Sequence, residues 1–157
     1  EDLHGRVTDC SLEGFLMAMD ISCHSFLRLA RRAEPLMATG GSLLTVSYYG
    51  SEKVVENYNM MGPVKAALES CVRYMAAELG GKGIRVNALS PGAMPTRAAS
   101  GLAGFESLME QSRAKAPLGR LAALEDVGAM AAFLASDAAR SITGGIHYID
   151  AGYEIVD

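Results

Sequence analysis

Two tyrosines and a lysine are the residues of this chain whose types and spacing best suggest chemistry. Tyr58 precedes Lys65 by seven residues, and Tyr48 precedes Tyr58 by ten. Seven helical residues complete two turns to within about 20°, so we expect Tyr58 and Lys65 to share one face at the start of a helix. A phenol beside an ammonium is a workable general acid, because the cation lowers the pKa of the tyrosine. The ammonium also has three donors that can hold a sugar hydroxyl.

The segments around these residues alternate between helix and strand. Apolar residues at helical spacing predict one long helix from about Leu12 to Met37, either straight or kinked near Pro35, with Ser11 as its N-cap. Short apolar runs, typical of parallel strands buried on both faces, alternate with further helical patterns. This alternation predicts an α/β fold, namely a partial Rossmann-like, doubly wound parallel sheet flanked by helices. The expected strands are 42–47, 84–89 and 146–150, and the further helices contain 64–79 and 127–134.

Two loops leave this expected sheet at the same edge. Tyr48 follows the first strand, and the segment from Ser90 to Thr96 follows the second. Open α/β sheets bind ligands outside the carboxyl ends of their strands. We therefore expect both loops, together with Tyr58 and Lys65, to converge on one crevice.

Composition and charge argue against several classes of protein. The chain has 157 residues, of which 50% are hydrophobic and 20% are charged, so it can form one globular domain. Its net charge of -4 and its lack of a basic block argue against nucleic acid as a partner. Cys10, Cys23 and Cys71 show no metal-binding spacing, and charged residues interrupt the apolar stretches. We expect no metal, no membrane association, reduced thiols and a cytoplasmic location.

Several segments resemble bacterial NADH-type enoyl-acyl-carrier-protein reductases, a divergent branch of the short-chain dehydrogenase/reductase superfamily. The similarity covers nearly the whole chain, and its most specific element is the spacing from Tyr58 to Lys65. The ordinary superfamily pattern places the lysine four residues after the tyrosine, where this chain has Gly62. The spacing therefore favours an enoyl reductase over a ketone reductase. The segments that carry the resemblance are Leu44–Gly50, Asn57–Gly62, Lys65–Glu69, Ile84–Gly92, Thr96–Gly101 and Glu125–Gly128.

The resemblance implies NADH-dependent reduction of trans-2-enoyl thioesters on acyl carrier protein, a step of fatty-acid elongation. Tyr58 would stabilise the thioester oxygen and supply or relay a proton, Lys65 would hold the nicotinamide ribose, and Tyr48 would lie beside the thioester. The stretch from Thr96 to about Met109 corresponds to a mobile substrate loop. The implied cofactor-binding residues are Lys65, Gly92, Met94, Pro95, Thr96, Arg97 and Ala98. The implied substrate-binding residues are Tyr48, Met61, Ala98, Leu102, Phe105 and Leu108.

The residues also leave other interpretations open. The apolar side chains between Ala98 and Met109 also fit an amphipathic helix packed on the core. A ketone-reducing member of the superfamily could use the same tyrosine and lysine, and a non-catalytic module could assemble through the first helices, which resemble those that form homotetramers in the superfamily. Pro63 lacks an N–H, so the helix that carries Lys65 either begins near Pro63 or bends there.

The chain lacks the strand, glycine-rich turn and helix with which dinucleotide-binding sheets normally open. Its glycine cluster at 80–83 follows a helical pattern and precedes a strand, so we interpret it as a helix end and a tight turn. We expect residues 1–157 to be the C-terminal part of a single short-chain dehydrogenase/reductase domain. By itself this polypeptide is expected to be inactive and to bind NADH weakly or not at all.

Overall fold

Three parallel strands form the centre of the structure, a computed structural model in which residues 5–96 and 104–156 are described. The strands lie side by side in the order β1-β2-β3, with Leu43 paired to Val86 and Ala88 paired to Ile146. Their carboxyl ends point to the same edge of the sheet. The strands are β1 (Gly41–Val46), β2 (Ile84–Pro91) and β3 (Ile146–Ile149), so β2 is two residues longer than predicted.

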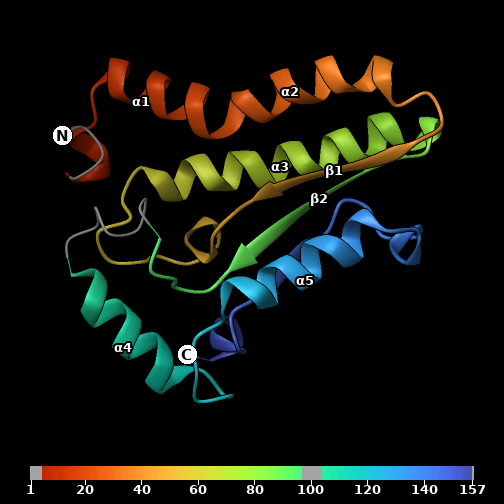
Figure 1. The fold of residues 1–157 in the computed structure, drawn as a ribbon. Helices are drawn as coiled ribbons and strands as arrows, with labels where there is room; N and C mark the ends of the chain where they lie inside the picture. Colours follow the sequence, from red (N-terminus) through yellow and green to blue (C-terminus); the bar gives the residue numbers. More distant parts are fainter. Residues whose placement is uncertain (1–4, 97–103, 157) are drawn as a thin grey trace.

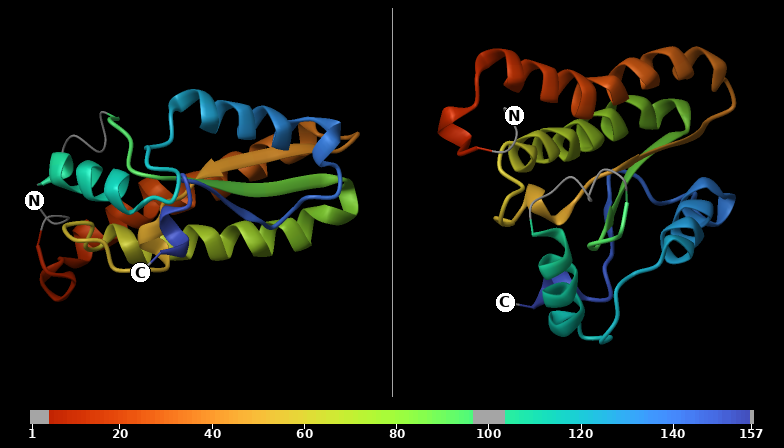
Figure 2. Two further views of the ribbon diagram at one scale, coloured as in Figure 1. Left: turned by 90° about the horizontal axis from the view of Figure 1, so that it is seen from below. Right: turned by 60° about the vertical axis from the view of Figure 1, so that its left-hand side comes forward.

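Helices cover both faces of this sheet (Figure 1). α3 (Met61–Leu79) packs on one face against β2, and α5 (Leu124–Ala135) packs on the other. α1 (Leu12–Met19) and α2 (Ser25–Ala33) lie outside α3, so the layers run helix, helix, sheet and helix. α4 (Phe105–Lys115) lies beyond the carboxyl ends of the strands, as both views in Figure 2 show. The predicted doubly wound α/β fold is confirmed.

The main hydrophobic core lies between α3, the sheet and the helices outside α3. Burying a Val or Leu side chain contributes about 1.5–3 kcal/mol, so this core holds α3 firmly on β2. A smaller cluster, on the α5 face, contains Leu89, Leu134 and Ala139. Members of the main core that are at most 1% exposed include Val64, Leu68, Val72, Ile84, Val86 and Ala88.

The first helical segment is not the single helix that was predicted from Leu12 to Met37. A π-helical turn, Asp20–His24, separates α1 from α2, and a 3-10 turn, Glu34–Leu36, ends the segment. The wider turn places Cys23 on the buried face, which a strict α-helical period would not do. Pro35 cannot donate an N–H, which explains the change of helix type at the end.

Two predicted helix ends, the N-cap at Ser11 and the end of the second helix at the glycine cluster, are confirmed. Ser11 is the N-cap of α1, because its hydroxyl accepts a hydrogen bond from the N–H of Gly14 at 3.0 Å. The glycine cluster after α3 forms a 3-10 turn that ends in Gly83 with a φ of 72°. Within residues 5–96 and 104–156, none of the helices combines the length and apolar character needed to cross a bilayer.

Candidate active site

The carboxyl end of β1 positions Tyr48. The N–H of Ser47 donates to the carbonyl of Leu89 at 2.7 Å, which ties the end of β1 to β2, and a 3-10 turn follows at Tyr49–Ser51. Tyr48 lies between the strand and this turn and is half-buried. Burial raises the pKa of Tyr48 to about 12, with smaller contributions from Tyr153 and Tyr49. Its hydroxyl is therefore protonated at neutral pH.

Tyr58 lies in the turn before α3, which corrects the prediction that it stands on the helix beside Lys65. Both flanking residues, Asn57 and Asn59, have a positive φ, 62° and 46°, which asparagine tolerates better than most residues. The helix begins at Met61, so Pro63 occupies the first turn, where its missing N–H needs no helical partner. Of the two alternatives for Pro63, the structure therefore shows a helix that begins close to it.

The rings of Tyr48 and Tyr58 meet edge to face, with their centroids 4.8 Å apart and an interplanar angle of 64°. Two glycines permit this contact. A Cβ at Gly50 would lie 2.5 Å from the Tyr58 ring, and a Cβ at Gly62 would lie 2.9 Å from the carbonyl oxygen of Gly50. Position 62 therefore has no room for the lysine of the four-residue spacing unless the backbone shifts.

The pKa of Tyr58 is raised, contrary to the expectation that Lys65 would lower it. Burial of the phenol is the largest cause, and Tyr48 adds to it. Both residues lie in the described part of the chain, and no hydrogen bond joins the Tyr58 hydroxyl to the Lys65 ammonium there. Tyr58 is consequently a neutral hydrogen-bond donor in this structure.

Lys65 lies in the second turn of α3, and its ammonium reaches the end of β1. Its Nζ donates to the carbonyl of Val46 at 2.7 Å. Burial lowers the pKa of Lys65, whereas Glu69 and Cys23 act in the opposite direction. Because the bond to Val46 uses one of three donors, two remain for a ligand.

A buried carboxylate that the sequence analysis did not single out lies one helical turn beyond Lys65. Glu69 is 3% exposed and accepts hydrogen bonds from the hydroxyls of Ser47 and Ser51, the latter at 2.6 Å. The sequence feature that could have identified Glu69 is its position four residues after Lys65, because residues four apart on a helix are neighbours on one face. The sequence could not show that two serines of another segment also reach it.

The segment after β2, predicted to bind the cofactor, leaves the same edge of the sheet. A Cβ at Gly92 would lie 3.0 Å from the Cβ of Asp150, so this position packs closely against the end of β3. Met94, Pro95 and Thr96 line a cavity of about 280 Å³ together with 122–125 at the start of α5. The other predicted cofactor-binding residues, Arg97 and Ala98, lie outside the described residues.

The predicted substrate-binding residues lie on two helices. Met61 begins α3 and packs against the main core. Phe105 and Leu108 belong to α4, are half-buried and lie beyond the strand ends. Residues 105–109, the last part of the expected substrate loop, are therefore helical. Ala98 and Leu102 lie outside the described residues.

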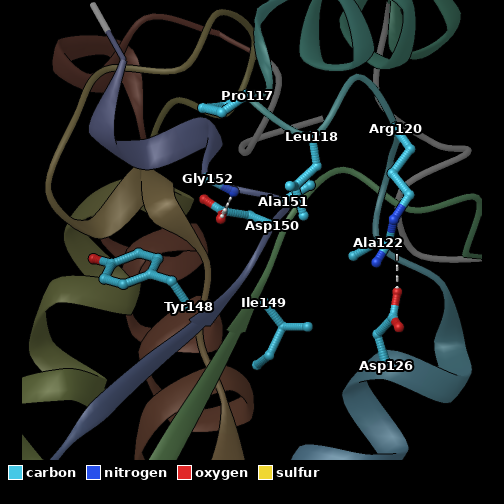
Figure 3. Close-up of a pocket in the computed structure, with 10 residues that line it drawn as sticks. All are labelled: Pro117, Leu118, Arg120, Ala122, Asp126, Tyr148, Ile149, Asp150, Ala151 and Gly152. Carbon is cyan, nitrogen blue, oxygen red and sulfur yellow. Dashed lines mark hydrogen bonds and ion pairs between the residues drawn. The ribbon is translucent and has the colours of Figure 1, made fainter.

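A larger cavity of about 420 Å³ opens between the end of β3 and the start of α5 (Figure 3). It contains none of the side chains of Tyr48, Tyr58 and Lys65, so it is separate from the tyrosine pair. The residues that line it are Pro117, Leu118, Arg120, Ala122, Asp126, Tyr148, Ile149, Asp150, Ala151 and Gly152.

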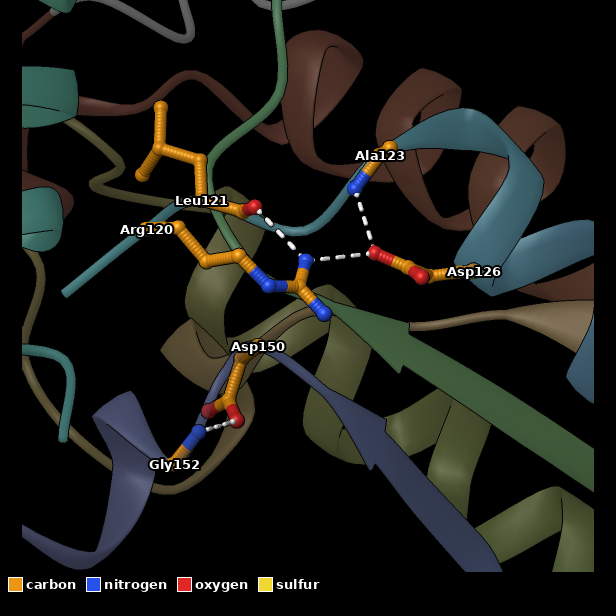
Figure 4. Close-up of polar contacts among 6 residues, drawn as sticks. All are labelled: Arg120, Leu121, Ala123, Asp126, Asp150 and Gly152. Atoms are coloured by element: carbon orange, nitrogen blue, oxygen red, sulfur yellow. Dashed lines mark hydrogen bonds and ion pairs between the residues drawn. The ribbon is translucent and has the colours of Figure 1, made fainter. Parts of the chain in front are cut away.

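Arg120 and Asp126 both line this larger cavity and form an ion pair with each other (Figure 4). The Arg120 guanidinium donates to the Asp126 carboxylate at 2.8 Å and to the carbonyl of Leu121 at 3.2 Å. The same carboxylate accepts from the N–H of Ala123 at 2.9 Å, which satisfies a donor at the start of α5. This N–H is the largest cause of the lowered pKa of Asp126, followed by Arg120.

The parallel sheet with helices on both faces defines the class of fold, a Rossmann-like α/β fold of the short-chain dehydrogenase/reductase type. A family profile described as Enoyl-(Acyl carrier protein) reductase matches residues 1–154. The chain therefore belongs to the enoyl-acyl-carrier-protein reductase family.

Curated relatives agree with this family. The chain is 48% identical over 155 residues to the enoyl-acyl-carrier-protein reductase (NADH) FabI of Rickettsia typhi, covering 99% of this chain and 59% of the relative. It is 50% identical over 154 residues to the FabI protein of Synechocystis, covering 98% and 60% respectively. The chain thus spans about 60% of the length of the curated relatives it matches.

Solved structures have the same fold. The enoyl-acyl-carrier-protein reductase of Bacillus cereus, solved with NADP+ and an indole naphthyridinone, superposes with a TM-score of 0.97 at 46% identity. The match covers 99% of this chain and 61% of that one. The reductase of Anaplasma phagocytophilum, solved with NAD, has a TM-score of 0.94 at 50% identity, covering 99% and 59%.

Proposed function

We propose that this chain carries the substrate-reducing chemistry of an NADH-dependent reductase of trans-2-enoyl thioesters on acyl carrier protein. The observation that carries the proposal is the Tyr48–Tyr58 ring contact of 4.8 Å at the carboxyl edge of the sheet, near the end of β1 where Lys65 is also held. The names of the relatives support the substrate and the coenzyme. In this proposal, residues 1–157 form the C-terminal part of a single domain of the family.

Tyr58 acts on the thioester carbonyl. Its raised pKa keeps the hydroxyl protonated, so it donates a hydrogen bond to the oxygen on which negative charge builds during reduction. The same group then supplies or relays a proton to the enolate. Tyr48 supports the ring of Tyr58 from its edge and lies beside the thioester.

The residues present fit the nicotinamide ribose end of the coenzyme. Lys65 has two donors left for a ribose diol, and the segment after β2 leaves the same edge of the sheet. When bound, NADH supplies the hydride that reaches the β-carbon of the substrate. The proposed contacts of the coenzyme with the segment after β2 are Gly92, Met94, Pro95, Thr96, Arg97 and Ala98.

The acyl chain is proposed to lie along the apolar side chains beyond the strand ends. Phe105 and Leu108 are half-buried on α4, and Met109 beside them is flexible enough to adapt to an aliphatic chain. Tyr48, Met61, Ala98 and Leu102 complete the proposed substrate contacts.

An assay of the protein expressed from its complete gene tests this function. Oxidation of NADH with a crotonyl thioester, and little with an acetoacetyl thioester, is the expected result. Preference for the acetoacetyl thioester would establish the ketone-reducing alternative, and activity with neither would support the non-catalytic module. Repeating the assay with NADPH identifies the coenzyme.

We also propose that the protein forms a homotetramer and works in the cytoplasm. The three cysteines are free thiols, which fits a reducing compartment. α1 and the segment through α2 expose several large apolar side chains, which fits self-association, and we expect sedimentation to show a tetramer. A strictly monomeric profile would refute self-association. The exposed apolar residues of this segment include Leu12, Leu16, Met17, Ile21 and Leu29.

A further inference from the structure

The buried carboxylate of Glu69 bridges both ends of the loop that carries Tyr48. Its Oε1 accepts hydrogen bonds from the hydroxyls of Ser47, at the end of β1, and Ser51, at the end of the following 3-10 turn. Residues 48–50 lie between these two anchors. The loop that includes Tyr48 is therefore fastened to α3 at two points.

The same carboxylate belongs to the surroundings of Lys65. Glu69 follows Lys65 by one helical turn, and Lys65 donates to the carbonyl of Val46, the residue before Ser47. The loop and the ammonium are thus attached to each other through α3 and the end of β1. A carboxylate that is 3% exposed is costly to bury, and the two hydroxyls and the nearby cation offset that cost.

We propose that Glu69 is a positioning residue for the reaction, which fixes Tyr48 through Ser47 and Ser51 and provides the counter-charge for Lys65. This proposal rests on the proposed function, because it assigns Glu69 a task in the same site. Glu69 itself touches neither the substrate nor the coenzyme.

The charged and titratable groups around Lys65 come from two elements. Glu69 on α3 and Cys23 on the π-helical turn both favour the ammonium, and burial opposes it. On the sheet side, the neutral carbonyl of Val46 accepts its hydrogen bond. Glu69 also raises the pKa of Tyr148 on β3, although burial and Glu52 have larger effects on that pKa. Burial lowers the pKa of Lys65, and the negative charge of Glu69 partly counteracts this effect. Without that charge the pKa should fall further, so Lys65 should lose its proton at a lower pH.

The first test replaces Glu69 by glutamine in the protein expressed from its complete gene. Glu69→Gln keeps a carbonyl oxygen that can accept from both serines, removes the negative charge and replaces the second oxygen by an NH2 group. We expect the pKa of Lys65, measured from the ¹³C shift of its labelled Cε, to fall by about one unit. The alkaline limb of the kcat profile should move to lower pH by the same amount. Glu78→Gln, on an exposed position of α3, is the matched control and should change neither quantity.

The second test removes the anchors and keeps the charge. Ser47→Ala combined with Ser51→Ala should lower kcat on the order of tenfold, because Tyr48 loses its fixed position, while the pKa of Lys65 stays near the wild-type value. An unchanged pKa and pH profile in Glu69→Gln, or an unchanged kcat in the double variant, would overturn the proposal. If either of these proteins does not fold, Ser51→Ala alone decides, because a lowered kcat supports the positioning role and an unchanged one refutes it.

The two readouts separate this inference from the proposed function. The NMR titration of Lys65 needs neither substrate nor coenzyme. If the wild-type protein fails to reduce enoyl thioesters while Glu69→Gln still lowers the pKa of Lys65, the proposed function fails and the counter-charge role stands. If the wild-type enzyme is active and its variants behave like the wild type, only the role of Glu69 fails.

Discussion

The two sides of the candidate active-site edge are built differently. On the β1–α3 side, Tyr48, Tyr58 and Lys65 stand next to the main core, and glycines allow contacts that a Cβ would prevent. On the side formed by the end of β3, the segment after β2, α4 and α5, the buried apolar cluster is small and two cavities of about 420 and 280 Å³ open. In α4, only Ser112 is buried.

In the proposed function, this difference in packing separates the residues that react with the substrate from the residues that select it. A proton donor and its neighbours must be held within a fraction of an ångström, which close packing and buried hydrogen bonds achieve. An acyl chain and a coenzyme need space and side chains that can adapt, which a loosely packed region provides. We therefore expect substitutions on the β1–α3 side to alter kcat or folding, and those on the α4 side to alter KM.

The largest expected effect comes from the hydroxyl of Tyr58. Tyr58→Phe should lower kcat by about 10²- to 10⁴-fold, because it removes the proposed proton donor and oxyanion partner. Its melting temperature should stay close to that of the wild type, since the ring is retained. Tyr74→Phe, at a position 70% exposed on α3, should leave kcat unchanged. Unaltered turnover in Tyr58→Phe would remove this residue from the mechanism.

Truncating one leucine on each side sharpens the comparison. Leu68→Ala, at a position 1% exposed in the main core, should lower the free energy of unfolding by about 2–5 kcal/mol in urea titrations. Leu108→Ala on α4 should cost less stability and raise KM for long acyl thioesters. Equal losses of stability in the two variants would show that the α4 side is as tightly packed as the β1–α3 side.

Gly50 tests how closely the tyrosine pair is packed. A methyl group at Gly50 would lie 2.5 Å from the Tyr58 ring, so Gly50→Ala should cost about 1–3 kcal/mol and reduce kcat by displacing that ring. Gly81→Ala, where nothing lies within 4 Å of the added group, is the control for both calorimetry and activity. Wild-type activity in Gly50→Ala would mean that the ring contact does not determine turnover.

The smallest expected effect concerns Asp126 on the open side. Its lowered pKa means that its contribution to stability is present above the pKa of the unfolded chain and is lost as the pH falls through the pKa of the folded form. Asp126→Asn should therefore lower the melting temperature slightly at pH 7 and leave it unchanged at strongly acidic pH. The solvent-exposed Glu110→Gln, in the middle of α4, serves as the control. If the melting temperature of Asp126→Asn stayed below that of the wild type at acidic pH, the charge of Asp126 would not be the cause of the lower stability.

Periodicity predicted the elements of this fold better than it predicted the site. The strands β1 and β3 and the helices around Leu68 and Leu134 follow the expected positions, because apolar spacing records which side chains face the core. The prediction of a single helix from Leu12 to Met37 was wrong in detail. A π turn interrupts that helix and buries Cys23, and packing against α3 favours this turn. α4 was only one of two alternatives, and its helical state could not be decided from apolar spacing.

The sequence by itself determined the α/β class and the choice of Tyr48, Tyr58 and Lys65, because residue types and their intervals are local properties of the chain. Only the tertiary structure decided how these groups meet. Tyr58 approaches Tyr48 from a turn rather than a helix, burial and the neighbouring Tyr48 raise the pKa of the phenol, and Glu69 gains two serine partners from a distant segment. Contacts between distant segments and the loss of solvent arise only when the chain packs, so no local pattern encodes them.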